Sequence, residues 1–232
     1  MENIKHIFFD LDNTLWDYRR NAKITLERLY NEFKIESKFG FTFSEFYPFY
    51  YESNEQLWAD YRDSKVTKED LRLRRFPKAF NNLGIPNTDF ALEFEKRFVE
   101  EVTLSNHLVE GAEDILDYLK NKYKIHILSN GFEEVTHFKI NKSKVKEYIQ
   151  TITTAESAGA PKPNGIAFQI ALEKAKASIG ESIYIGDDWL ADMIGATQFG
   201  MRAIFFNPLN ETHPWIESVP VIDKLVELKK YL

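Results

Sequence analysis

The chain lacks cysteine altogether, with none among its 232 residues. It therefore cannot form a disulfide, bind zinc through thiolates or use a cysteine nucleophile. Long apolar runs are also absent, so no segment is long enough to span a bilayer. The N-terminus lacks the basic stretch and apolar run of a signal peptide. We therefore expect a cytoplasmic protein with no membrane partner.

An excess of positive charge is missing as well. The formal net charge is −6 and the sequence pI is about 5.5, and no basic stripe follows the chain. Long nucleic acid is therefore not an expected partner, and an anionic ligand would have to be held by local groups. Hydrophobic residues make up 44% of the chain, which is ordinary for a globular protein. We expect a monomer or weak homodimer.

Short apolar runs, each ending at turn residues, alternate with helical patterns along most of the sequence. This alternation predicts an α/β fold: a Rossmann-like parallel sheet with helices on both faces. The expected strands are residues 4–9, 124–128, 149–154, 182–185 and 202–206. The expected helices between them are residues 113–122, 132–145, 164–176 and 190–199.

Residues 17–106 have a different character, with no convincing strand and many aromatic and charged residues. Helical patterns cover residues 22–33, 43–61, 68–83 and 88–104, and Pro77 is expected to kink or break the third. We therefore predict an α/β core formed by residues 1–16 and 107–232. An all-helical domain, residues 17–106, is inserted after its first strand.

Polar residues follow the predicted strands at their carboxyl ends, where ligands bind in open α/β sheets. Asp10 and Asp12 follow the first strand, Ser129-Asn130 the second, and Asp187-Asp188 the fourth, while Lys162 comes shortly after the third. Carboxylates gathered in this way repel one another, and Mg²⁺ is a suitable counter-ion because it prefers oxygen ligands.

This set of groups can transfer a phosphoryl group. Asp10 can act as a nucleophile, and Asp12 can protonate the leaving oxygen and later activate water. Ser129, the Asn130 amide and Lys162 can stabilise charge on the transferred oxygens. The expected substrate is a small phosphate ester.

Four segments resemble the motifs of the haloacid dehalogenase-like hydrolases, in the order of that family. Residues 9–15 (FDLDNTL) resemble motif I (DxDxT) and residues 128–131 (LSNG) resemble motif II. Lys162 between two prolines resembles motif III, and residues 186–192 (GDDWLAD) resemble motif IV. The resemblance implies a Rossmann-like core with a helical cap inserted after motif I.

The resemblance also implies roles for single residues. Asp10 would be the nucleophile and a Mg²⁺ ligand, and Asp12 would be the acid/base and bind Mg²⁺ through its backbone carbonyl. Asp187 would be the third protein ligand. Asp188 and Asp192 would orient Lys162 or a metal-bound water, or bind the metal themselves.

The helical insert is similar to the cap of bacterial pyrimidine nucleoside monophosphate phosphatases. The similar segments are residues 57–62 (LWADYR), 67–71 (TKEDL) and 75–76 (RF). Asn13 departs from this subgroup, in which motif I more often carries Glu. The acylneuraminate 9-phosphate phosphatases share DLDNTL, so a sugar phosphate is the alternative substrate.

Two other reactions of this superfamily, and a binding role of another class, are alternatives to a phosphatase. A 2-haloacid dehalogenase attacks carbon and needs no acid at the second motif I position, so Asp12 argues against it. A phosphomutase stays open, because the sequence does not show whether water is excluded from the site. A non-catalytic binding protein would have no need of the charge-repelling cluster of Asp10, Asp12, Lys162 and Asp187.

Overall fold

The computed structural model describes residues 3–232 and contains one parallel sheet with the strand order β3-β2-β1-β4-β5-β6. Strand β1 is central and fully buried, and its last residue, Phe9, pairs with Ile127 of β2 and Ile185 of β4. The predicted α/β class is confirmed. The strands are β1 His6–Phe9, β2 Lys124–Ser129, β3 Ile149–Thr154, β4 Ser182–Gly186, β5 Arg202–Phe206 and β6 Val221–Ile222.

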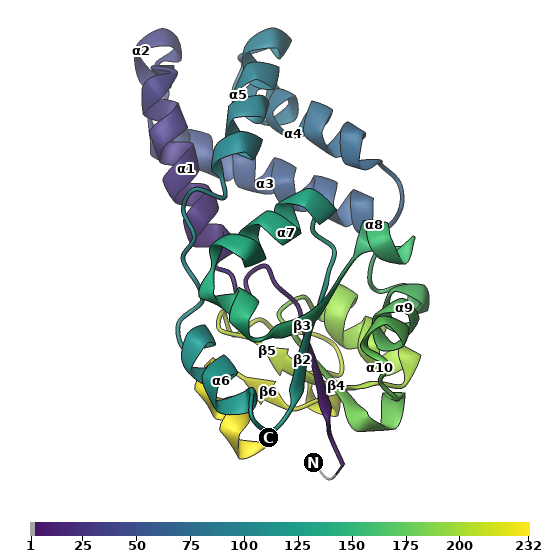
Figure 1. The fold of residues 1–232 in the computed structure, drawn as a ribbon. Coiled ribbons are helices and arrows are strands. Elements are labelled where there is room, and N and C mark those ends of the chain that lie inside the picture. Colours follow the sequence, from purple (N-terminus) through teal and green to yellow (C-terminus); the bar gives the residue numbers. More distant parts are fainter. Residues whose placement is uncertain (1–2) are drawn as a thin grey trace. The chain divides into compact units, whose positions relative to one another are not determined.

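Helices cover both faces of this sheet, as predicted. Figure 1 shows α9 and α10 on one side of the strands and α6 on the other. The core under α9 and α10 includes Phe8, Phe168, Tyr184 and Phe205. The helices are α6 Ala112–Leu119, α7 Glu133–Lys142, α8 Ala155–Ala158, α9 Gly165–Ala175 and α10 Gly195–Phe199, with short helical turns at Lys144–Glu147, Ile179–Glu181, Trp189–Ile194, Ile216–Ser218 and Leu225–Lys230.

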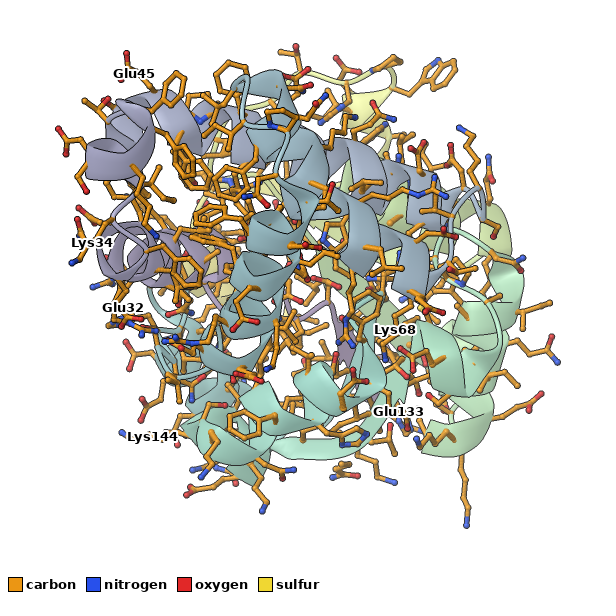
Figure 2. The ribbon with its side chains drawn as sticks, turned by 90° about the horizontal axis from the view of Figure 1, so that it is seen from above. Glu32, Lys34, Glu45, Lys68, Glu133 and Lys144 are labelled. Atoms are coloured by element: carbon orange, nitrogen blue, oxygen red, sulfur yellow. The ribbon has the colours of Figure 1, made fainter. Side chains whose placement is uncertain are left out.

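The chain forms two compact units: an α/β unit, made of the residues up to Tyr18 and Asn106–Leu232, and a helical unit, Arg19–Ser105. The helices are α1 Tyr18–Glu32, α2 Ile35–Phe39, α3 Phe43–Arg62, α4 Lys68–Asn82 and α5 Thr88–Glu101. Capping boxes at Thr42 and Thr67 begin α3 and α4, where Figure 2 labels Glu45 and Lys68. Among the described residues, no helix is both long and apolar enough to cross a membrane.

The helical unit packs around aromatic rings and one buried ion pair. The Phe76 ring lies 4.8 Å from that of Phe94 and 5.3 Å from that of Phe98. Beside them, Arg75 donates to both carboxylate oxygens of Glu95, at 3.0 and 2.6 Å. A bidentate partner of this kind compensates for burying the guanidinium.

The expected break at Pro77 does not occur, because α4 runs through it from Lys68 to Asn82. A proline within a helix removes the donor for the carbonyl four residues earlier. That carbonyl belongs to Leu73, a residue that is 51% exposed, so this part of the helix faces solvent. Sequence patterns also missed α2 and β6, which are only five and two residues long.

Candidate active site

Asp10 lies one residue beyond β1, at the carboxyl edge of the sheet. Its backbone N–H donates to the carbonyl of Ile185 at 2.9 Å, which extends the pairing with β4. The chain then turns sharply, since the carbonyl of Leu11 accepts from the N–H groups of both Leu15 and Trp16. The Asp10 side chain is thereby fixed at the edge and is only 7% exposed.

Lys162 contacts three buried polar side chains. Its Nζ lies 2.7 Å from Asp10 Oδ1, 2.6 Å from Asp192 Oδ1 and 2.7 Å from Tyr184 Oη. The Asn130 side chain holds its backbone, accepting from the Lys162 N–H at 2.7 Å and donating to its carbonyl at 2.9 Å. Asn130 therefore joins the end of β2 to the Lys162 loop.

Asp192, which contacts the Lys162 ammonium, lies in the π-helical turn Trp189–Ile194 that follows β4. Its Oδ2 accepts from the Asp188 N–H at 3.0 Å. A side chain at Gly186 would overlap the Asp192 carboxylate, so glycine is required there. Tyr184 completes the arrangement by donating its hydroxyl to the Leu128 carbonyl at 2.8 Å.

The charges of these groups do not cancel. Burial raises the pKa of Asp10 to about 7, against the opposing effect of Lys162, and burial also raises the pKa of Asp192. Burial alone would lower the pKa of Lys162, but Asp10 and Asp192 outweigh it and the net direction is upward. Lys162 is therefore held as a cation, and its single positive charge does not offset the burial of two carboxylates, whose pKa values stay raised.

The donor set fits a hard divalent cation. Asp10, Asp187 and Asp192 each offer one carboxylate oxygen, and these oxygens lie within 4.8 Å of one another. Asp187 also accepts from the Thr14 hydroxyl at 3.0 Å. Both oxygens of Asp192 are engaged, Oδ1 by Lys162 and Oδ2 by the Asp188 N–H, whereas Asp10 contacts Lys162 through Oδ1. Asp10 and Asp187 therefore suit the ion better, and oxygen ligands of this kind are those of Mg²⁺.

The remaining predicted site residues have other contacts. Ser129, at the end of β2, accepts from the Gly131 N–H at 3.0 Å. Asp188 caps the π-helical turn by accepting from the N–H groups of Leu190 and Ala191, both at 2.9 Å. The Asp12 carboxylate pairs with Lys139 of α7.

Sequence analysis did not single out Tyr184, Lys139 or Thr14 as site residues. A weak signal exists for each. A tyrosine within a buried strand needs a partner for its hydroxyl. Lys139 stands beside Ile140 on the buried face of α7, where an apolar residue is expected. Thr14 lies within motif I itself.

A family model described as "Haloacid dehalogenase-like hydrolase" matches residues 7–206. The chain belongs to this hydrolase family. The resemblance carried by the four motifs is thus confirmed, and the protein is an enzyme of the hydrolase class.

Three relatives illustrate the similarity. The pyrimidine 5'-nucleotidase YjjG of Escherichia coli is 25% identical over 228 residues, which cover 97% of this chain and 96% of YjjG. The ribulose-1,5-bisphosphate 5-phosphatase of Halopiger xanaduensis is 26% identical over 212 residues, which cover 89% of this chain and 86% of the relative. The crystal structure of the Bacillus subtilis hydrolase YfnB bound to magnesium matches with a TM-score of 0.88 at 22% identity. The match covers 100% of this chain and 99% of YfnB.

Proposed function

We propose that this hydrolase cleaves small phosphate monoesters with Mg²⁺ as its cofactor, through a phosphoryl group carried transiently by Asp10. The observation that supports this most is the bond between the Lys162 ammonium and Asp10 at the carboxyl edge of the sheet. Lys162 opposes the rise in the pKa of Asp10 that burial causes, and so favours the ionised, nucleophilic form of the carboxylate over what burial alone would allow. The same ammonium lies where it can contact a phosphoryl oxygen.

In the proposed first step, a carboxylate oxygen of Asp10 attacks phosphorus and the bond to the ester oxygen breaks. Asp12 gives its proton to the leaving alcohol. In the second step, Asp12 takes a proton from water, which attacks the phosphoryl group. Inorganic phosphate leaves and the Asp10 carboxylate is restored. Ser129, Asn130 and Lys162 hold the phosphoryl oxygens.

Three residues would hold Mg²⁺: Asp10 and Asp187 through their carboxylates, and Asp12 through its backbone carbonyl. When bound, the ion screens the incoming phosphate from the carboxylates and polarises it. Asp192 fixes Lys162 instead, and Asp188 fixes the start of the π-helical turn. The relative YfnB is bound to magnesium, which supports Mg²⁺ as the ion.

The proposed substrate is a pyrimidine nucleoside 5'-monophosphate. Its support is the similarity to YjjG over nearly the whole of both chains, together with the segments at residues 57–62 and 67–71. A sugar phosphate is the second candidate. It is favoured by Asn13 within DLDNTL and by the similarity to a ribulose bisphosphate phosphatase.

The test is phosphate release from a panel of esters, with Mg²⁺ or with a chelator. The panel contains UMP, dUMP, dTMP, purine nucleotides, sugar phosphates and 4-nitrophenyl phosphate. Magnesium-dependent release led by the pyrimidine nucleotides is expected. Fastest release from a sugar phosphate would support the proposed reaction but make a sugar phosphate the substrate. Transfer of the phosphoryl group to a second hydroxyl would indicate a mutase. No release from any ester in the presence of Mg²⁺ would contradict the proposal.

A further inference from the structure

The buried face of α7 carries a lysine to which the proposed reaction assigns no role. Helix α7 begins at Glu133, labelled in Figure 2, and buries Thr136, Lys139 and Ile140. Lys139 is only 4% exposed, whereas Lys142, three residues later, is exposed. Lysine is almost never buried without a partner, so the environment of Lys139 indicates what it does.

Three groups surround the Lys139 ammonium. Its Nζ lies 2.5 Å from Asp12 Oδ1, 4.2 Å from the centre of the Trp16 ring and 5.4 Å from the centre of the Tyr18 ring. Both ring contacts are within the range of a cation–π interaction. Trp16 is itself fully buried and donates its Nε1–H to Asn106. The ammonium is therefore held in one position, and its bond to Asp12 has one direction.

The second oxygen of Asp12 lies beside the loop after β2. A Cβ atom at Gly131 would stand 3.4 Å from Asp12 Oδ2 and 2.8 Å from Thr136 Oγ1. Only a residue without a side chain fits between Asp12 and α7 there. The Asp12 carboxylate is thus bounded by Lys139 on one oxygen and by the Gly131 backbone near the other.

Asp12 does not belong to the group of converging carboxylates, although only one residue separates it from Asp10. That group consists of Asp10, Asp187 and Asp192. A flexible carboxylate so close in sequence would be drawn to a divalent cation bound there, since unlike charges at a few ångströms attract strongly in a low-dielectric site. The contact with Lys139 opposes this movement.

We infer that Lys139 is a positioning residue that holds the Asp12 carboxylate on α7, off the cation and free to transfer a proton. This inference rests on the proposed function. Lys139 acts through Asp12 and not on the phosphoryl group. Its loss should therefore weaken the two proton transfers of Asp12, to the leaving alcohol and from water, and leave phosphoryl transfer to Asp10 nearly unchanged where the leaving group needs no proton.

The leaving group separates these effects. A nucleoside or sugar alcohol must be protonated as it departs, whereas 4-nitrophenolate leaves readily without a proton. The value of kcat/KM reports phosphoryl transfer to Asp10 for both kinds of ester. Positioned acid–base groups contribute about 10²- to 10⁴-fold to such steps. With Asp12 present but misplaced, we expect Lys139→Met to lower kcat/KM by roughly 10- to 100-fold for the best alkyl ester of the panel and by less than about 3-fold for 4-nitrophenyl phosphate.

Two further variants serve as controls. Lys139→Arg keeps the positive charge and should recover most of the alkyl ester activity. Lys142→Met removes the same charge from an exposed position on the same helix and should leave both activities unchanged. An equal loss on both esters with Lys139→Met, or no loss on the alkyl ester, would overturn the inference.

A magnesium titration by calorimetry tests the same inference without turnover. Freed from Lys139, the Asp12 carboxylate should reach the cation, so Lys139→Met should bind Mg²⁺ several-fold more tightly than the wild type or Lys142→Met. The gain should shrink when Asp12→Asn is added. An unchanged affinity would contradict the positioning role. A wild-type protein that releases no phosphate from any ester would instead refute the proposed function, and the titration would still decide the role of Lys139.

Discussion

The Asp10→Asn substitution should stabilise the metal-free protein while abolishing its activity. Asp10 is buried together with a second carboxylate, Asp192, and the two share one cation, Lys162. When both carboxylates are ionised, one buried negative charge remains uncompensated, which destabilises the fold. The substitution removes that charge and keeps the size of the side chain, whereas an enzyme that needs Asp10 as its nucleophile cannot work with an amide.

The magnitude follows from the pKa of Asp10, which rises from a usual value of 3.8 to about 7 on folding. A folded-state pKa that lies above the unfolded one contributes stability that is complete below pH 3.8 and is lost as the pH rises to about 7. One pKa unit corresponds to about 1.4 kcal/mol. Ionised Asp10 should thus cost the metal-free fold up to about 4 kcal/mol above pH 7.

The assay is urea unfolding in a chelator at several pH values. The free energy of unfolding of Asp10→Asn should exceed that of the wild type by up to about 4 kcal/mol at pH 8. This difference should shrink as the pH falls towards 4. Mg²⁺ should then stabilise the wild type more than the variant, because only the wild type keeps the full ligand set. Asp114→Asn is an exposed control that should change stability by less than about 0.5 kcal/mol. A variant that is no more stable than the wild type at pH 8 would refute the claim that an uncompensated carboxylate is buried here.

Three further predictions concern the buried polar groups. Lys162→Met leaves two buried carboxylates without their cation, so the free energy of unfolding should fall by about 3–5 kcal/mol in urea titrations. Tyr184→Phe removes the hydroxyl that contacts Lys162, Asp192 and the Leu128 carbonyl, which should cost about 1–3 kcal/mol and lower kcat. His126 is buried against His6 and Thr151, and burial lowers its pKa to about 4. The stability that neutral His126 contributes to the fold is complete above pH 6.5 and is lost as the pH falls to about 4. The difference in the free energy of unfolding between His126→Phe and the wild type should therefore change by up to about 3 kcal/mol over that range.

Much of the site could be predicted because polar residues at strand ends are visible in the sequence. Asp10 and Asp187 each come directly after a buried strand, and Ser129 is the last residue of one. Parallel strands bring such positions to one edge of the sheet whatever their distance along the chain. Lys162 was found through its motif, and the structure adds what holds it: Asn130 on its backbone and Asp192 on its ammonium.

What the sequence could not show are contacts between side chains on different elements. The pair formed by Lys139 and Asp12 joins residues 127 positions apart. It depends on how α7 lies against the loop after β1, which periodicity does not specify. The break expected at Pro77 was wrong, because the sequence signals the lost hydrogen bond but not that the affected carbonyl belongs to an exposed residue.

Trapping the phosphorylated enzyme is the most direct test that Asp10 carries the phosphoryl group. Asp12→Asn should still be phosphorylated by 4-nitrophenyl phosphate, whose leaving group needs no acid, but should lose the base that activates water for the second step. Mass spectrometry of the quenched variant should then show one phosphoryl group on the peptide that contains Asp10, and none when Asp10 is also replaced by Asn. A phosphoryl group on another residue, or turnover by the Asp10→Asn variant at the wild-type rate, would contradict the mechanism.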